Sequence, residues 1–162
     1  SWHRKAADQG NANAQTTLGY AYRSGRGVPP DDAQAVAWYR KAAEQGTAGA
    51  QSILGLAYRT GQGVPQDDVE AVSWYRKAAE QGHADAQFNL GVMYRTGRGV
   101  PQDLVEAHKW RNLAASRASA ENQTRYAESR DAVAKKMTPQ QIADAQQRAT
   151  DWLTAFEQRD GK

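Results

Sequence analysis

The chain has 162 residues, 40% of them hydrophobic and 24% charged, a composition that indicates a folded globular chain rather than a disordered one. The formal net charge is only +3 and both signs are interspersed, which argues against a nucleic-acid partner and against a basic membrane-binding face. No apolar run approaches the ~18 residues that a membrane span needs, and the absence of cysteine excludes disulfides and thiol chemistry.

The chain contains an internal repeat with a period of 36 residues. Residues 11–46 and 47–82 agree at 25 of 36 positions, and a third copy covers 83–118. Residues 1–10 match only the second half of this unit, so we expect a half repeat there whose first half lies upstream of Ser1. The recurrent positions include Trp38, Trp74 and Trp110; Gly19, Gly55 and Gly91; Tyr22, Tyr58 and Tyr94; and Pro29, Pro65 and Pro101.

Each copy begins with an expected helix, over roughly 11–24, 47–60 and 83–96. In the first copy Ala14, Leu18 and Tyr22 are spaced as one apolar stripe of a helix. Gly-x-Gly-Val-Pro follows each time; its first glycine suits the left-handed position past a helix end, and its proline prevents the helix from resuming. A glycine inside a helix, such as Gly19, costs about 1 kcal/mol relative to alanine. We therefore expect a neighbouring helix to approach it closely.

A second helix is expected after each Gly-x-Gly-Val-Pro segment, running through the recurrent tryptophan and ending, in the first copy, near Gly46. Its start has a capping-box-like pattern, in which Asp31 is followed three residues later by Gln34. The turn after it is very short, so consecutive helices should be antiparallel. We expect the tryptophans to fill the space between repeats.

The repeat pattern weakens after residue 118. Residues 119–136 read as a degenerate repeat, in which Gln123 is still in phase but Ala127 replaces the recurrent glycine. Within 137–162, Thr138 and Pro139 predict the start of a last helix, with proline at its first position. We expect this segment to be a capping helix and tail that closes the stack. Its apolar residues are Ile142, Ala145, Ala149, Trp152, Leu153 and Phe156.

The repeated unit resembles the Sel-one-like repeat, a subclass of the tetratricopeptide-like α/α solenoids. The resemblance is carried by Ala-x-Ala-Gln-x-x-Leu-Gly-x-x-Tyr-x-x-Gly-x-Gly-Val-Pro-x-Asp and then Ala-x-x-Trp-Tyr-Arg-Lys-Ala-Ala-Glu-Gln-Gly, and it covers nearly all of residues 1–136. It implies an all-α, right-handed superhelical solenoid with the first helices on its concave side. It also implies adaptor or scaffold roles in bacterial signalling, envelope assembly or host contact, and favours a periplasmic or secreted location. Some Helicobacter members are cysteine-rich, and this chain departs from that branch.

The motifs give no candidate catalytic residue, metal ligand or cofactor site. Gly-x-Gly follows a helix and lacks the Lys-Ser/Thr of a phosphate loop, so it is interpreted as a helix stop. Paired aspartates such as Asp31 and Asp32 fall at helix starts, where the macrodipole favours negative charge. The histidines His3, His83 and His108 lack metal-ligand spacing. No serine is followed by the x-x-Lys of penicillin-active enzymes.

The non-recurrent residues of the first helices define the predicted partner-binding site. They fall opposite the apolar stripe, yet several are apolar, and an exposed apolar patch often marks a contact site. In the alternative interpretation they pack on neighbouring repeats and the arginines are solvated. Tyr39 and Tyr75, on the second helices, are expected to be partly exposed. The predicted concave-face site comprises Tyr20, Arg23, Ile53, Leu56, Arg59, Phe88, Asn89, Val92 and Arg95.

Three hypotheses for function remain open at this point. The first is a non-enzymatic adaptor that binds a protein or peptide with apolar anchors and acidic flanks. The second is a binder of cell-envelope glycan or peptidoglycan, in which Tyr20 and Phe88 stack on sugar rings. The third is a penicillin-active hydrolase, which requires turnover of a penicillin-type or peptidoglycan substrate.

Overall fold

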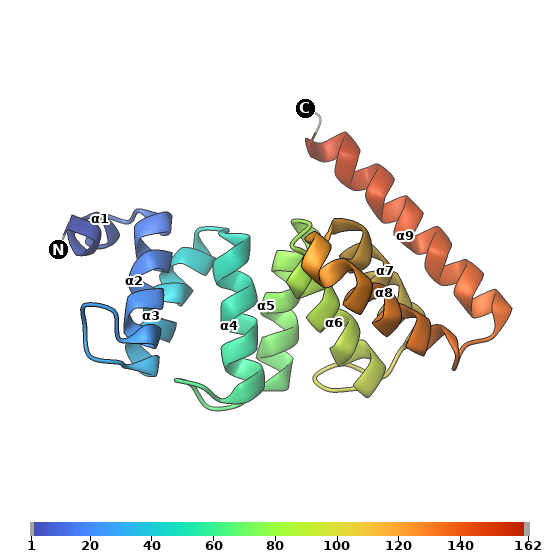
Figure 1. Cartoon of the computed structure of the whole chain (residues 1–162), viewed down its shortest axis with the longest axis horizontal. Coiled ribbons are helices and arrows are strands. Elements are labelled where there is room, and N and C mark those ends of the chain that lie inside the picture. The colour runs from blue at the N-terminus through green and yellow to red at the C-terminus, as the bar shows by residue number, and fades with distance from the viewer. Residues whose placement is uncertain (1, 161–162) are drawn as a thin grey trace. The chain divides into compact units, whose positions relative to one another are not determined.

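The computed structural model describes residues 2–160, with side chains from residue 4 onward, and this range contains helices and no strand. The expected all-α architecture of repeated helix pairs is therefore confirmed. None of the described helices is both long and apolar enough to cross a membrane. In chain order (Figure 1) the helices are α1 (Trp2–Asp8), α2 (Ala12–Ser24), α3 (Asp32–Glu44), α4 (Ala48–Thr60), α5 (Asp68–Glu80), α6 (Ala84–Thr96), α7 (Leu104–Arg117), α8 (Ala120–Ala134) and α9 (Pro139–Asp160).

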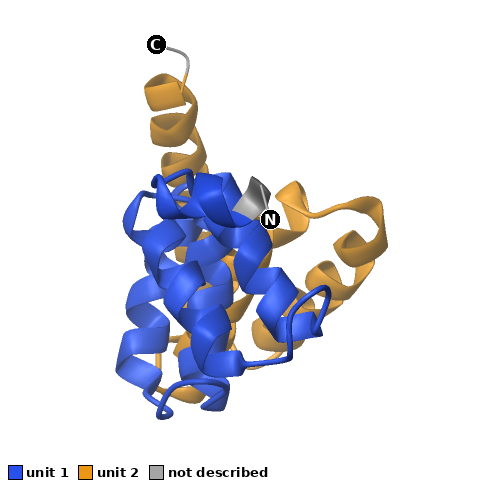
Figure 2. Ribbon diagram, turned by 90° about the vertical axis from the view of Figure 1, so that its left-hand side faces the viewer, with its two compact units in different colours: residues 1–81 blue, residues 82–162 orange. Residues whose placement is uncertain are grey.

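The helices form two compact units, residues 1–81 and residues 82–162 (Figure 2). In unit 1, α1 packs on α2, and the pairs α2–α3 and α4–α5 are joined by contact of α3 with α4. In unit 2, α6 packs on α7, and α7 also contacts α8 and α9. Each unit therefore contains complete helix pairs of the repeat.

The first helix of each repeat ends as the sequence predicts. Gly25 and Gly61 have φ values of 71° and 74°, in the left-handed region that favours glycine. The second glycine of the motif also has a positive φ, 76° at Gly63, and at Gly63 a close neighbour adds a further constraint. A Cβ on Gly63 would collide with the carbonyl group of Asp32, so Gly63 allows the loop of one repeat to approach the second helix of the preceding repeat.

The second helices begin with only half of the expected capping box. Asp31 accepts a hydrogen bond from the backbone N–H of Gln34 at 2.9 Å, as the pattern predicts. The reciprocal bond is replaced, because the backbone N–H of Asp31 donates to the carbonyl of Tyr22 at 2.9 Å. In the next repeat the backbone N–H of Asp67 donates to the carbonyl of Tyr58. This bond fastens each second helix to the end of the first.

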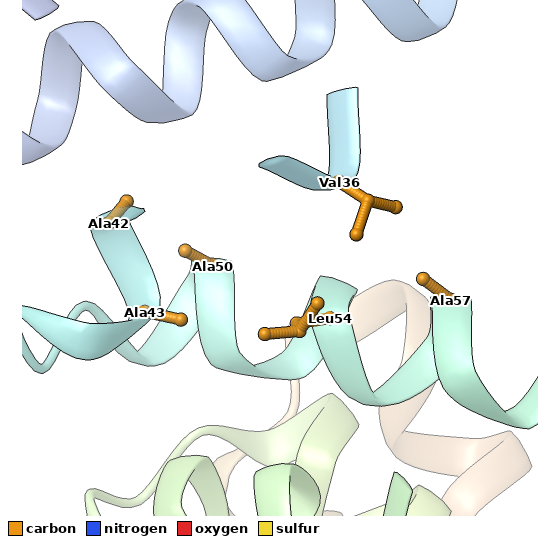
Figure 3. Close-up of a cluster of buried hydrophobic side chains, with 6 residues drawn as sticks. All are labelled: Val36, Ala42, Ala43, Ala50, Leu54 and Ala57. Carbon is orange, nitrogen blue, oxygen red and sulfur yellow. The ribbon is translucent and has the colours of Figure 1, made fainter. Parts of the chain in front are cut away.

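The core of unit 1 consists mainly of small side chains. One cluster contains Val36, Ala42 and Ala43 from α3 with Ala50, Leu54 and Ala57 from α4 (Figure 3). Trp38 packs in a second cluster against Ala7, Ala14 and Leu18, and only 6% of its surface is exposed. Trp74 is half-buried against the first cluster. The tryptophans therefore pack between repeats, as expected.

Buried glutamines connect successive helix pairs. Gln51 donates from Nε2 to the carbonyl of Ala43 at 3.1 Å, and its Oε1 accepts from Gln81 at 2.7 Å. Gln15 repeats this pattern with Ala7 and Gln45. In unit 1 the recurrent glutamines Gln15 and Gln51 are themselves buried, and both the nitrogen and the oxygen of each side-chain amide have hydrogen-bond partners.

The glycines inside the first helices face large side chains of the second helices. A Cβ on Gly19 would lie 2.7 Å from Cε1 of Tyr39, and one on Gly55 would lie 2.7 Å from Cδ1 of Tyr75. The expectation that these tyrosines are partly exposed is wrong, because their relative exposures are 1% and 0%. Each ring occupies the space that a glycine leaves open in the facing helix.

The last helix, α9, starts with a complete capping box. Thr138 Oγ1 accepts from the backbone N–H of Gln141 at 3.2 Å, and Gln141 Oε1 accepts from the backbone N–H of Thr138 at 2.9 Å. Along α9, Ala145 and Ala149 are buried, and the ring of Trp152 lies edge-on to Trp110 of α7, with centroids 5.9 Å apart. The helix therefore covers one side of α7 within unit 2.

Candidate functional site

Three residues of the predicted site, Arg23, Ile53 and Leu56, meet in one cleft between the two helix pairs of unit 1. Ile53 and Leu56 are half-buried and Arg23 is exposed. The space in this half-open cleft that a water-sized group can occupy measures about 20 Å³, which is room for one such group. The complete lining is Arg23, Asp32, Ala35, Val36, Tyr39, Ile53, Leu56, Ala57 and Gln62. We call this the unit 1 cleft.

Tyr39 lines the unit 1 cleft and was not part of the predicted site. Its hydroxyl is buried and has no hydrogen-bond partner among the described residues. Burial raises the pKa of this phenol to about 12, against a smaller opposing effect of the Arg23 charge. The hydroxyl is therefore a protonated donor at neutral pH. The sequence predicted a partly exposed Tyr39, so it gave no signal of a buried and unsatisfied hydroxyl.

Charged groups lie on the wall of the same cleft. The Arg23 guanidinium lies over the ring of Tyr20, 5.0 Å from its centroid, and within the described chain no carboxylate pairs with it. Tyr20 is 44% exposed and its ring meets Tyr39 edge-on at 5.5 Å. On another part of the wall, Gln62 Nε2 donates to the carboxylate of Asp32 at 3.2 Å. The cleft thus has one cation without an anionic partner and one carboxylate that already has a donor.

The second helix pair of unit 1 contains the same residue types in a closed arrangement. Arg59 Nε donates to the hydroxyl of Tyr75 at 3.3 Å. Burial raises the pKa of Tyr75, and the Arg59 hydrogen bond and charge oppose this shift. Arg59 is therefore part of a packed pair rather than a solvated cation.

In unit 2 the predicted site residues lie on α6, and Phe88 differs most from expectation. Its ring stacks on Tyr126 of α8, with centroids 4.3 Å apart and an interplanar angle of 13°. It therefore packs against a buried cluster instead of standing exposed. The degenerate repeat supplies Tyr126, and its hydroxyl donates a short hydrogen bond to Asp85.

The remaining unit 2 residues are half-buried as well. Asn89 donates from its side chain to the carbonyl of Asp85 at 2.9 Å, so it folds back onto its own helix. Val92 is half-buried. Arg95 is close enough to the buried Arg111 for its charge to lower the pKa of that residue, which burial already lowers, to about 10. This part of the predicted site is therefore cationic and more tightly packed than the unit 1 cleft.

Within residues 4–160, no group of three or more His, Asp or Glu side chains is arranged to hold a metal ion. The Nδ1 atom of His83 accepts a hydrogen bond from the backbone N–H of Ala86 at 3.4 Å, so it acts as a helix cap. His3 was also considered from the sequence, and its side chain lies outside the described residues.

The sequence matches the Sel1 repeat over residues 1–11, 12–47, 48–83 and 84–119. Solved structures are similar to it. A Sel1 repeat protein from Oxalobacter formigenes is 44% identical with a TM-score of 0.68, over 73% of this chain and 45% of that one. A protective antigen of uropathogenic Escherichia coli with an SLR fold is 32% identical with a TM-score of 0.58, over 96% of this chain and 40% of that one.

Cysteine-rich protein B of Helicobacter pylori is similar in fold alone, at 22% identity and a TM-score of 0.58, over 74% of this chain and 86% of that one. No curated protein matches the sequence. The chain spans less than half the length of the Oxalobacter and Escherichia proteins. The repeat match extends over most of the chain, and the helix pairs that it predicts are present in the structure. The chain therefore belongs to the Sel1 repeat family.

Proposed function

We propose that this chain is a non-catalytic scaffold that binds a segment of a partner protein across the surface of the unit 1 cleft. Sel1 repeat proteins are generally protein-interaction scaffolds. The observation that supports this location is the cleft itself, where half-buried Ile53 and Leu56 lie beside the exposed cation of Arg23. An apolar surface bordered by polar groups is a typical contact site for a peptide.

The setting that we propose is bacterial envelope assembly or signalling outside the cytoplasm. The Escherichia coli protein that is 32% identical is described as a protective antigen. That description supports our proposal of a periplasmic or secreted location for this chain.

Binding of glycan or peptidoglycan is the second candidate, and exposed Tyr20 is the observation that favours it. A sugar ring stacks on an open aromatic face. The Arg23 guanidinium already covers one face of Tyr20, and Tyr126 covers a face of Phe88. These contacts favour the protein-binding proposal over the glycan proposal.

The test compares capture of a partner protein with sedimentation on purified peptidoglycan. The variant Leu56→Ala removes apolar surface from the cleft, and Val69→Ala removes a 66% exposed apolar side chain of α5 that does not line it. We expect Leu56→Ala to weaken capture of a defined partner at least about fivefold, roughly the effect of losing 1 kcal/mol, while Val69→Ala leaves it unchanged. Equal capture by both variants would contradict the proposal, and sedimentation with peptidoglycan would favour the second candidate.

The proposal assigns no catalytic step to the chain. A hydrolase would turn over a chromogenic penicillin-type substrate or release peptides from peptidoglycan. We expect no turnover above that of a heat-unfolded sample, and turnover that depends on the folded chain would overturn this part of the proposal.

A further inference from the structure

We propose that the unit 1 cleft recognises a carboxylate next to an apolar side chain, with the Tyr39 hydroxyl and the Arg23 guanidinium as donors. The inference rests on the proposed function and names the chemistry of the segment that the cleft accepts. It is carried by a difference between two equivalent pairs of residues in the same unit.

The hydroxyl of Tyr39 is buried and unsatisfied. The residue is 1% exposed, and its Oη has no hydrogen-bond partner among the described residues. Buried polar atoms are almost always hydrogen-bonded, so an orphan of this kind needs an explanation. Tyr39 lines a cleft that has room for one water-sized group. Neighbouring side chains cover the hydroxyl itself, so an oxygen atom in the cleft reaches it only when those side chains shift.

Tyr39 and Tyr75 differ in whether an arginine donates to their hydroxyl group. Arg59 donates to Tyr75 Oη at 3.3 Å, whereas the equivalent Arg23 lies over the ring of Tyr20. The residue equivalent to Tyr20 in the next repeat is Leu56, which has no ring to attract a guanidinium. The exchange of one aromatic residue for leucine thus accounts for a closed pair in one repeat and an open pair in the other.

The donors of the cleft indicate which chemical group occupies it. The protonated Tyr39 hydroxyl donates, and the Arg23 guanidinium is an uncompensated cation, so both favour an anionic acceptor. The cleft has room for a single acceptor oxygen, and in a segment of a partner protein the anionic acceptor is a carboxylate. Asp32 on the cleft wall keeps its negative charge although Gln62 donates to it, so the carboxylate of the occupant lies at the Arg23 side of the cleft. Ile53 and Leu56 then contact the apolar neighbour of the carboxylate.

The experiment is a titration of the whole chain, followed by NMR of isoleucine and leucine methyl groups and of arginine side-chain N–H groups. The probe is N-acetyl-leucine, which carries a carboxylate beside an apolar side chain. The matched neutral probe is N-acetyl-leucinamide. We expect N-acetyl-leucine to shift the signals of Ile53, Leu56 and Arg23 and to bind at least about tenfold more tightly than the amide, because a hydrogen bond to a charged group is lost with the carboxylate.

Two variants that each remove one hydroxyl group test whether Tyr39 donates to the probe. Tyr39→Phe keeps the ring that packs on Gly19 and removes only the hydroxyl, so the fold is retained. We expect this variant to bind N-acetyl-leucine at least about tenfold more weakly than the unmodified chain does. Tyr75→Phe removes the equivalent hydroxyl, which lies outside the cleft lining, and should leave probe binding unchanged. Equal affinities for acid and amide, or undiminished binding to Tyr39→Phe, would overturn the inference.

The outcomes separate this inference from the proposed function. If Leu56→Ala impairs capture of the partner protein but Tyr39→Phe does not, the cleft binds a partner without recognising a carboxylate, and only the inference fails. If neither variant impairs capture, the cleft is not the binding surface and both fail. If both variants impair capture and N-acetyl-leucine binds as expected, both are supported.

Discussion

The two units fill the space beside a glycine of the first helix with different side chains. In unit 1, Tyr75 fills the space beside Gly55, and its hydroxyl accepts from Arg59. At the equivalent position of unit 2, Arg111 packs its aliphatic stem beside Gly91, with Cγ 2.8 Å from the position of an added Cβ. Its Nη1 donates to the carbonyl of Ser129 at 2.8 Å.

This difference shows which part of the repeat pattern is required for packing. The glycine keeps space open in the first helix, and a long side chain of the second helix fills that space whatever its chemistry. Arg111 does so at a cost, because it is 3% exposed and its Nε has no hydrogen-bond partner among the described residues. Substitutions that change either the filled volume or the chemistry of these side chains test which of the two determines stability.

The largest effect is expected from emptying the space in unit 1. Tyr75→Ala removes a fully buried ring, and the free energy of unfolding should fall by about 3–5 kcal/mol. Tyr75→Phe keeps the ring and should cost about 1 kcal/mol, since it removes only one hydrogen bond. Urea unfolding followed by circular dichroism measures both. A loss from Tyr75→Ala below about 1 kcal/mol would show that the ring is not essential for packing.

Filling the glycine position should be the next largest effect. Gly55→Ala places a methyl group 2.7 Å from the buried Tyr75 ring, so overpacking should cost about 1–3 kcal/mol despite the better helix propensity of alanine. Gly49, in the same helix, has no atom within 4 Å of an added Cβ. Gly49→Ala is therefore the matched control and should stabilise the chain by about 0.5–1 kcal/mol. The same sign for both variants in urea unfolding would contradict the packing account.

Replacing the buried cation of unit 2 should change stability less. Arg111→Met keeps a long side chain beside Gly91 and removes a charge whose pKa burial lowers to about 10. A buried charge is often exchanged for an apolar residue without loss, so we expect the unfolding free energy to stay within about 1 kcal/mol or to rise. A loss as large as that of Tyr75→Ala would show that the guanidinium itself, through Ser129, holds α8 in place.

The smallest effect concerns the helix caps and has a pH dependence. Asn11 caps α2 in unit 1 with a 2.9 Å bond, whereas His83 caps α6 in unit 2 with a 3.4 Å bond to its Nδ1. Burial lowers the pKa of His83 below its usual value near 6.5, despite the opposing charge of Asp85. Between these two pKa values the unfolded chain binds more protons than the folded chain. The stability from this group is therefore complete above about pH 6.5 and is lost as the pH falls below it.

His83→Asn gives α6 of unit 2 the same capping residue that Asn11 provides for α2. We expect it to raise the unfolding free energy by up to about 1 kcal/mol and to reduce the loss of stability between about pH 7 and about pH 5. Burial also lowers the pKa of His108, so part of the pH dependence should remain in the variant. Urea midpoints at the two pH values test this, and an unchanged pH dependence would show that His83 does not contribute.

The repeat period made the framework of the fold predictable. The Gly-x-Gly-Val-Pro segments predicted where the first helices end, and Asp31 and Pro139 predicted where later helices start; the structure confirms these ends. The burial of Tyr39 was not predictable from periodicity, because a stripe of apolar residues does not reveal that Gly19 leaves space for a ring. The bond from Asp31 N–H to Tyr22 also depends on the path of the loop, which the capping pattern does not specify.

The candidate site was predictable only in part. The contrast between recurrent and varying positions identified Arg23, Ile53 and Leu56, which line one cleft. It did not identify Tyr39, whose buried hydroxyl has no partner among the described residues, while the nearby Arg23 lies over the ring of Tyr20. It also did not anticipate that the degenerate repeat supplies Tyr126 to cover Phe88. Both outcomes depend on side-chain neighbours from different helices, which a pattern within one helix does not contain.

The central claim is that the recurrent side chains pack the repeats, while the varying face of the first helices binds a partner. The most direct test is photo-crosslinking with benzoylphenylalanine at position 20 or at position 69 of the whole chain. Both positions carry exposed apolar side chains in unit 1, Tyr20 on a first helix and Val69 on a second. The account predicts a crosslink to a defined partner protein from position 20 and none from position 69. A crosslink from position 69 alone would contradict it.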